Sequence, residues 1–135
     1  MARIEGGCAC GRIRYFSAAD PVMVVNCHCE DCRKTSGGAF SFNLVMPAGT
    51  VTVTGTDATY PDGNGASGKP FSRHFCPSCG THFRSEGEGH EGIEMIKAGT
   101  LDHPEGFAPM AHIWVEQKLP WVAIPEGAPQ FPRQP

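Results

Sequence analysis

Apolar and β-branched residues occur in short runs that are separated by glycine, proline or aspartate. Valine, isoleucine, phenylalanine and threonine dominate these runs, and such residues favour strands. The runs predict seven short strands, at residues 13–16, 22–26, 40–46, 51–54, 71–75, 93–98 and 111–115. The sequence therefore predicts a mainly β fold.

One helix is predicted at residues 30–36. Glu30 and Asp31 would lie at its N-terminus, where acidic residues are favoured, and Arg33 and Lys34 follow. Two other segments lack periodicity: residues 61–70 resemble a linker, and residues 125–135 form a proline-rich tail. We expect both segments to be mobile.

Length and composition limit the possible classes of protein. The chain has 135 residues, which fits a single domain over residues 1–135, and a net charge of -3. That charge gives no basic surface for nucleic acid, and no apolar run is long enough to cross a membrane. The first ten residues lack the apolar centre of a signal peptide. These features predict a cytoplasmic protein that binds neither nucleic acid nor membrane.

The seven cysteines suggest a metal site. An odd number cannot be paired completely in disulfides, and a reducing compartment disfavours disulfides in any case. All seven lie in three tight clusters rather than at scattered core positions. These clusters are Cys8-Ala-Cys10, Cys27-His-Cys29-Glu-Asp-Cys32 and Cys76-Pro-Ser-Cys79. Such spacings are typical of thiolate ligands to zinc.

Counting ligands favours one division of these cysteines between two zinc ions. A closed tetrahedral site needs four ligands, which Cys8, Cys10, Cys76 and Cys79 would supply. The remaining cysteines, Cys27, Cys29 and Cys32, would hold a second Zn²⁺ with one coordination position open, and they are the candidate catalytic residues. A division that places Cys27 and Cys29 with Cys76 and Cys79 stays possible at this stage.

The order of these motifs resembles that of a known family. The relevant residues are Gly7-Cys8-Ala-Cys10-Gly11, Arg14-Tyr15, Cys27-His28-Cys29, Cys32-Arg33, Gly37, Phe75-Cys76, Cys79-Gly80, Ala98-Gly99-Thr100-Leu101-Asp102, His112-Ile113 and Pro120-Trp121. This set, within residues 6–131, resembles the glutathione-dependent formaldehyde-activating enzymes, also called the centromere protein V-like domain. The resemblance implies an Mss4-like complex of short antiparallel sheets stapled by two zinc ions, with the same division of cysteines. The glycine-rich residues 62–69 depart from it.

The resemblance also implies an activity. Glutathione, or a related thiol, would add to formaldehyde or another small aldehyde, which is the chemistry of a carbon-sulfur lyase in reverse. Metal binding favours this addition because the thiolate is the nucleophile. The alternative is a non-catalytic zinc module that binds a thiol or a protein. The sequence leaves the substrates and the oligomeric state open.

Several other residues near these motifs have two interpretations. Arg33, Arg73 and Arg84 would either lie in solvent or hold a carboxylate of the thiol. We expect His28, between two cysteines, to face solvent or to support a ligand, and His112 to be a buried core histidine.

Overall fold

The computed structural model describes residues 4–63 and 68–135. In chain order, these contain β1 (Ile4–Gly7), β2 (Arg14–Ser17), β3 (Met23–Cys27), α1 (Glu30–Ser36), β4 (Ser41–Pro47), β5 (Thr52–Thr54), β6 (Ala58–Asp62), β7 (Phe71–Phe75), β8 (His82–Gly87), β9 (Ile93–Lys97) and β10 (Ala111–Ile113). The described residues also contain three short 3₁₀ helices, at Ala98–Thr100, Pro104–Gly106 and Val115–Gln117. The predicted mainly β fold with one short helix is confirmed.

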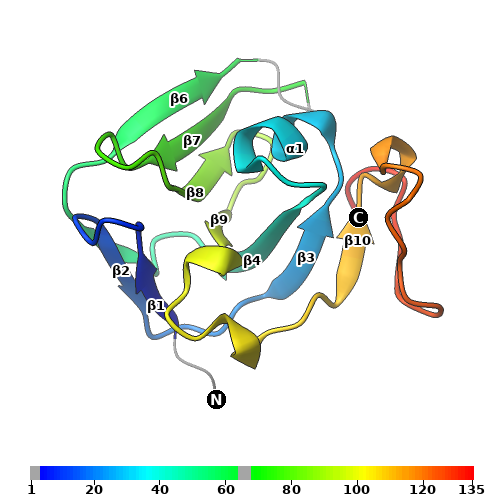
Figure 1. Ribbon diagram of the computed structural model, residues 1–135, viewed down its shortest axis with the longest axis horizontal. Coiled ribbons are helices and arrows are strands. Elements are labelled where there is room, and N and C mark those ends of the chain that lie inside the picture. The colour runs from blue at the N-terminus through cyan, green and yellow to red at the C-terminus, as the bar shows by residue number, and fades with distance from the viewer. Residues whose placement is uncertain (1–3, 64–67) are drawn as a thin grey trace.

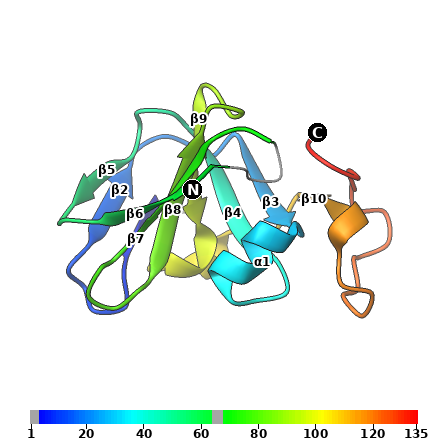
Figure 2. The ribbon, with the colours of Figure 1, turned by 90° about the horizontal axis from the view of Figure 1, so that it is seen from above.

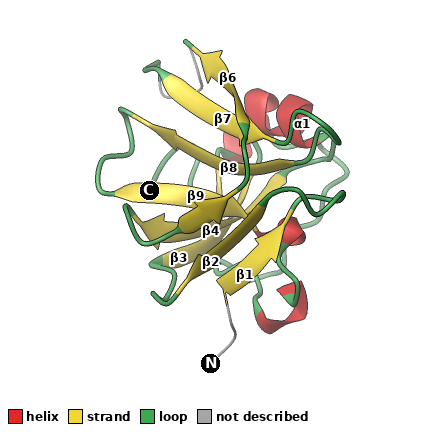
Figure 3. Ribbon diagram, turned by 90° about the vertical axis from the view of Figure 1, so that its left-hand side faces the viewer, coloured by secondary structure: helices red, strands yellow, loops and turns green. Residues whose placement is uncertain are grey.

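The strands form two sheets. The larger sheet has the order β10-β3-β4-β9-β8-β7-β6, and the smaller has the order β1-β2-β5. Neighbouring strands are antiparallel except β10, which runs parallel to β3. Figure 1 shows β1 and β2 on the opposite side of the molecule from β10. Figure 3 shows the larger sheet stepping from β6 to β3, with β2 and β1 beyond it.

The two faces of the larger sheet have different roles. Successive residues of a strand point to opposite faces, so Leu44 and Ile96 face one side while Asn43 and Lys97 face the other. Leu44 and Ile96 are fully buried and belong to the main core with Tyr15 of the smaller sheet. The opposite face of the larger sheet is therefore free to line a site.

All seven predicted strands are present, displaced by two residues or fewer at their ends, and α1 has the predicted bounds. Three strands were not predicted: β1, β6 and β8. β1 ends in two glycines, and β6 contains Pro61, which is tolerated because β6 is an edge strand. β8, with sequence HFRSEG, is mostly polar. Phe83 packs in the main core, and Ser85 faces the other side because a register shift between β7 and β8 interrupts the alternation of the strand.

The proline-rich tail is packed against β10, so the expectation of a mobile tail was wrong. The amide of His112 donates to Pro129 O at 2.9 Å, and the amide of Trp114 donates to Arg133 O at 3.0 Å. The last residues accordingly lie beside β10 (Figure 1 and Figure 2). Within the predicted linker, Pro61 and Asp62 belong to β6, and residues 64–67 lie outside the described part of the chain.

Among the helices of residues 4–63 and 68–135, none has the length and apolar character needed to span a membrane.

Candidate metal centres

Four cysteine sulfurs meet between two tight turns. Cys8 and Cys10 lie between β1 and β2, and Cys76 and Cys79 lie between β7 and β8. All four Sγ atoms lie within 4.8 Å of one another. Cys10 Sγ is 3.6 Å from Cys8 Sγ and 3.7 Å from Cys76 Sγ. Four sulfurs at about 2.3 Å from a zinc ion would be about 3.8 Å apart, so this four-cysteine group fits a closed tetrahedral site.

Local hydrogen bonds hold two of these sulfurs in place. The amide of Ile13 donates to Cys8 Sγ at 3.2 Å, and Cys79 Sγ is hydrogen-bonded to Thr81 Oγ1 at 3.3 Å. The hydroxyl and amide of Thr81 lower the pKa of Cys79 to about 5. Gly80 follows with a φ of 78°, a left-handed conformation that favours glycine at the end of the turn. The turn is therefore shaped to stabilise a thiolate.

The other three cysteines gather where β3 meets α1. Cys27 ends β3, Cys29 caps the helix by accepting from the amide of Cys32 at 3.2 Å, and Cys32 lies in the first helical turn. Their sulfurs lie within 4.8 Å of one another, and Cys32 Sγ is 3.2 Å from Cys27 Sγ. All three are buried, and Trp114 packs against them. This three-cysteine group offers three of the four ligands of a tetrahedral site.

The three thiols of this group differ in acidity. Hydrogen bonds with Cys27 and Cys29 hold the pKa of Cys32 well below its ordinary value, and the charges of Lys97 and Arg73 lower it further. Hydrogen bonds with Cys29 and Cys32 raise the pKa of Cys27. For Cys29, the hydrogen bond with Cys27 lowers the pKa, but Cys32 and burial outweigh it and raise the pKa to about 11.

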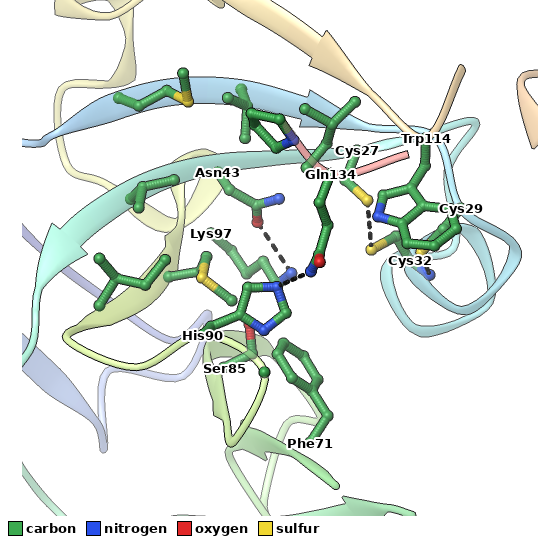
Figure 4. A pocket seen from close by; sticks show the side chains of 18 of the residues that line it. Cys27, Cys29, Cys32, Asn43, Phe71, Ser85, His90, Lys97, Trp114 and Gln134 are labelled. Carbon is green, nitrogen blue, oxygen red and sulfur yellow. Dashed lines mark hydrogen bonds between the residues drawn. The ribbon is translucent and has the colours of Figure 1, made fainter. Parts of the chain in front are cut away.

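A cavity of about 360 Å³ opens beside the three-cysteine group, and all three cysteines line it. Its floor is the face of the larger sheet that points away from the main core. Residues on that face include Met23 and Val25 of β3, Asn43 and Val45 of β4, Ser85 of β8, and Met95 and Lys97 of β9. Trp114 forms a side wall next to the cysteines (Figure 4). The cavity thus combines an apolar surface with a few polar groups, as ligand pockets commonly do.

Two buried cations line this cavity. Arg73 is 3% exposed, and its Nε lies 3.3 Å from Asp62 Oδ2. Lys97 is 8% exposed, and its Nζ donates to Ser41 Oγ at 2.8 Å and to Asn43 Oδ1 at 3.0 Å. Burial lowers the pKa of Lys97, and the nearby cysteines act against that shift. Both positive charges lower the pKa of Cys32, so they act on the three-cysteine group.

The tail contributes to the entrance of the cavity. Gln134 and Pro135 line it, and Gln134 Nε2 lies 2.6 Å from His90 Nε2. Figure 4 shows these two side chains meeting over the cavity between Phe71 and the cysteines. A ligand that approaches the three-cysteine group therefore passes beside Gln134 and His90.

A sequence model of the glutathione-dependent formaldehyde-activating enzymes matches residues 3–117. The chain belongs to this family. Both cysteine groups fall inside the match, whereas the tail that reaches the cavity lies beyond it. The match ends earlier than residue 131, the limit suggested by the motifs.

A crystal structure of a Rhodobacter sphaeroides protein resembles the chain, with a TM-score of 0.59 and 16% sequence identity. The likeness covers 78% of this chain and 98% of that one, and at such low identity it shows the fold alone. Family membership, unlike the fold, bears on the activity. It suggests glutathione-dependent formaldehyde activation, for which the cavity beside the three-cysteine group is the candidate site.

The structure tests the expected burial of four residues near the motifs. Arg73 was expected to lie in solvent unless it held a carboxylate of the thiol; it is buried and paired with Asp62. His28 does not face solvent, because it is fully buried with Nε2 3.2 Å from Nδ1 of His112. The prediction that His112 is a buried core histidine is confirmed. Arg84 is paired with Glu94 and is not among the described residues that line the cavity.

Sequence reasoning missed Lys97, Ser85 and Gln134. Lys97 is adjacent to the core residue Ile96, so strict alternation along β9 would have placed it on the opposite face. Ser85 lies two residues after the core residue Phe83, so strict alternation would have placed both on one face; the register shift between β7 and β8, which leaves Phe83 unpaired, and the pairing of Ser85 with β9 put Ser85 on the cavity face. No comparable signal exists for Gln134, because its position depends on how the tail packs against β10.

Proposed function

We propose that this protein is a zinc-dependent enzyme that adds glutathione, or a related thiol, to formaldehyde or another small aldehyde. The product would be S-(hydroxymethyl)glutathione or its analogue, and the reaction class is a carbon-sulfur lyase operating in reverse. One observation carries the proposal. The three-cysteine group lies in the wall of a cavity, buried and open on the cavity side, in a member of a family named for this reaction.

The four-cysteine group is proposed to hold a structural zinc. It joins the turn after β1 to the turn after β7, which are 66 residues apart between Cys10 and Cys76. Closing a long loop in this way removes conformational entropy from the unfolded chain, as a disulfide does. Under this proposal the whole chain is a single zinc-binding domain.

Cys27, Cys29 and Cys32 are proposed to hold the second zinc. When bound there, the ion would lower the pKa of a thiol that occupies its fourth position. The protein's own residues provide the surroundings. Trp114 shields the sulfurs from solvent, and the buried charges of Arg73 and Lys97 offset the excess negative charge of three thiolates and one divalent ion.

The pocket also offers polar and apolar contacts to an extended thiol. Gln134 and His90 at the entrance supply neutral hydrogen-bonding groups, and Met95, Val45 and Ile93 supply apolar contact for an extended ligand. We propose that the reaction takes place in the cytoplasm, where a reducing environment would keep the clustered cysteines available as metal ligands.

The test is the rate of adduct formation in the presence of zinc-loaded protein, compared with the spontaneous rate in the same buffer with free zinc. We expect acceleration by the wild-type protein and none by a Cys29→Ser variant that remains folded. A wild-type rate equal to that of buffer would refute the enzymatic proposal and would favour a non-catalytic thiol-binding module.

A further inference from the structure

Lys97 is a buried cation whose hydrogen-bonding capacity is not fully used. An ammonium group has three N–H donors, and Ser41 Oγ and Asn43 Oδ1 accept from two of them. Within the described residues, no carboxylate lies within 4.0 Å of Lys97, whereas the neighbouring buried cation Arg73 is paired with Asp62. The negative charge that acts on Lys97 comes from the three-cysteine group, and a buried cation with an unused donor would also stabilise a negative oxygen that develops in the cavity.

The sheet register places Lys97 close to the sulfurs. Cys27 lies directly opposite Ser41, and Asn43 lies directly opposite Lys97, so all four side chains share one face of the sheet. Lys97 Nζ is held 2.8 Å from the hydroxyl of Ser41, the residue that is the cross-strand neighbour of Cys27. Figure 4 shows Lys97 and Asn43 on the same cavity floor as the cysteine group. The ammonium therefore lies where a molecule reacting at the sulfurs would be within reach.

A second group on this floor has no partner. Ser85 is 1% exposed and lines the cavity, and its Oγ forms no hydrogen bond with any described residue. Ser85 pairs with Met95, two residues before Lys97 on the same face of β9. A buried hydroxyl without a partner costs about 1–3 kcal/mol unless a ligand or water satisfies it. Lys97 and Ser85 thus each have an unused donor in the lining of the cavity.

We propose that Lys97, assisted by Ser85, binds the carbonyl oxygen of the aldehyde. This inference rests on the proposed function and adds the group that acts on the electrophile. The thiolate sulfur forms the C–S bond with the carbonyl carbon, and the electron pair of the C=O π bond moves to oxygen. Lys97 donates a hydrogen bond to the developing alkoxide and passes it a proton. The proton that the thiol has lost then returns to Lys97 through solvent. Thiol and aldehyde thus yield one hydroxymethyl thioether with no oxidation or reduction.

The first test decides whether Lys97 acts on the aldehyde or on the thiol. In Lys97→Met, which keeps the length of the side chain, we expect the catalysed rate at saturation to fall on the order of 10²-fold, as for loss of an oxyanion donor. The affinity for glutathione, measured by calorimetry, should fall far less than the rate, because Lys97 is only one of the cations near the thiolates. Lys97→Arg should recover part of the rate. If Lys97 instead holds a carboxylate of the thiol, glutathione affinity will fall while the saturated rate holds, and the proposal is overturned.

The second test does not depend on turnover. Formate is a one-carbon oxyanion, and ¹³C-formate can be titrated by NMR against zinc-loaded protein whose fourth zinc position is filled with saturating glutathione. We expect saturable binding to the wild type, loss of binding in Lys97→Met, weaker binding in Ser85→Ala, and unchanged binding in Lys34→Met, which removes an exposed lysine. Equal formate binding by wild type and Lys97→Met would overturn the assignment of Lys97. A wild-type protein that binds formate through Lys97 but does not accelerate the reaction would refute only the proposed function.

Discussion

Replacing Cys79 and Cys29 separately distinguishes a metal-stapled fold from one held by packing alone. Cys79 is exposed, whereas Cys29 is 2% exposed. If packing decided stability, Cys79→Ser would change the free energy of unfolding by about 0.5 kcal/mol or less, as is usual for surface substitutions, and Cys29→Ser would cost more. The proposed metal sites predict the opposite order.

The expected loss of stability follows from how far apart in the chain the cysteines of each group lie. The four-cysteine group links residues 66 apart, and the loop-closure entropy of such a link corresponds to about 4 kcal/mol. The three-cysteine group links residues only five apart, which corresponds to about 2 kcal/mol. In a domain of this size, the difference of about 2 kcal/mol should lower the melting temperature of Cys79→Ser by about 8 °C more than that of Cys29→Ser.

The assay is thermal and urea unfolding of both variants, with zinc bound and after chelation. With zinc bound, we expect Cys79→Ser to be the less stable variant. After chelation, Cys79→Ser should be nearly as stable as wild type, because neither then has the closed site. A Cys29→Ser protein that is less stable than Cys79→Ser with zinc bound would refute this division of the cysteines.

Two further predictions concern the whole domain. Elemental analysis should find two zinc ions per chain, since seven thiolates fill one closed site and three positions of another; one ion or none after purification in zinc would contradict this count. Burial lowers the pKa of His82 to about 4, so protonation of this histidine opposes folding. Its contribution to the free energy of unfolding is fully present above about pH 6.5 and is lost as the pH falls towards 4. Urea unfolding of wild type and His82→Gln between pH 4 and 7 should show a shallower pH dependence for the variant, and parallel curves would exclude this contribution.

The sequence predicted the features that rest on local patterns. The seven predicted strands and α1 are short runs whose residue types match their structure, and the cysteine spacings place each cluster on one turn. β8 was missed because it is mostly polar, and one of its polar residues, Ser85, lines a cavity that forms only when β3, β4 and β9 have assembled. From the sequence alone, a polar residue on that face would be interpreted as solvent-exposed.

The chemistry of the cavity depends on long-range pairing for the same reason. Arg73 is buried because β6 brings Asp62 beside it, and Lys97 is buried because β4 brings Ser41 and Asn43 beside it. No local pattern distinguishes such residues from surface charges. The tail is a further case, since its proline-rich composition favours mobility and only its hydrogen bonds to β10 fix it.

The most direct test of the central claim compares glutathione with S-methylglutathione. If an exogenous thiolate completes the site on Cys27, Cys29 and Cys32, glutathione should bind more tightly as the pH rises from about 6 to 8, because coordination releases the thiol proton. S-methylglutathione keeps both carboxylates but has no such proton, and it should bind poorly at every pH. Calorimetry with zinc-loaded protein measures both affinities. Equal binding of the two compounds, with no dependence on pH, would contradict the account.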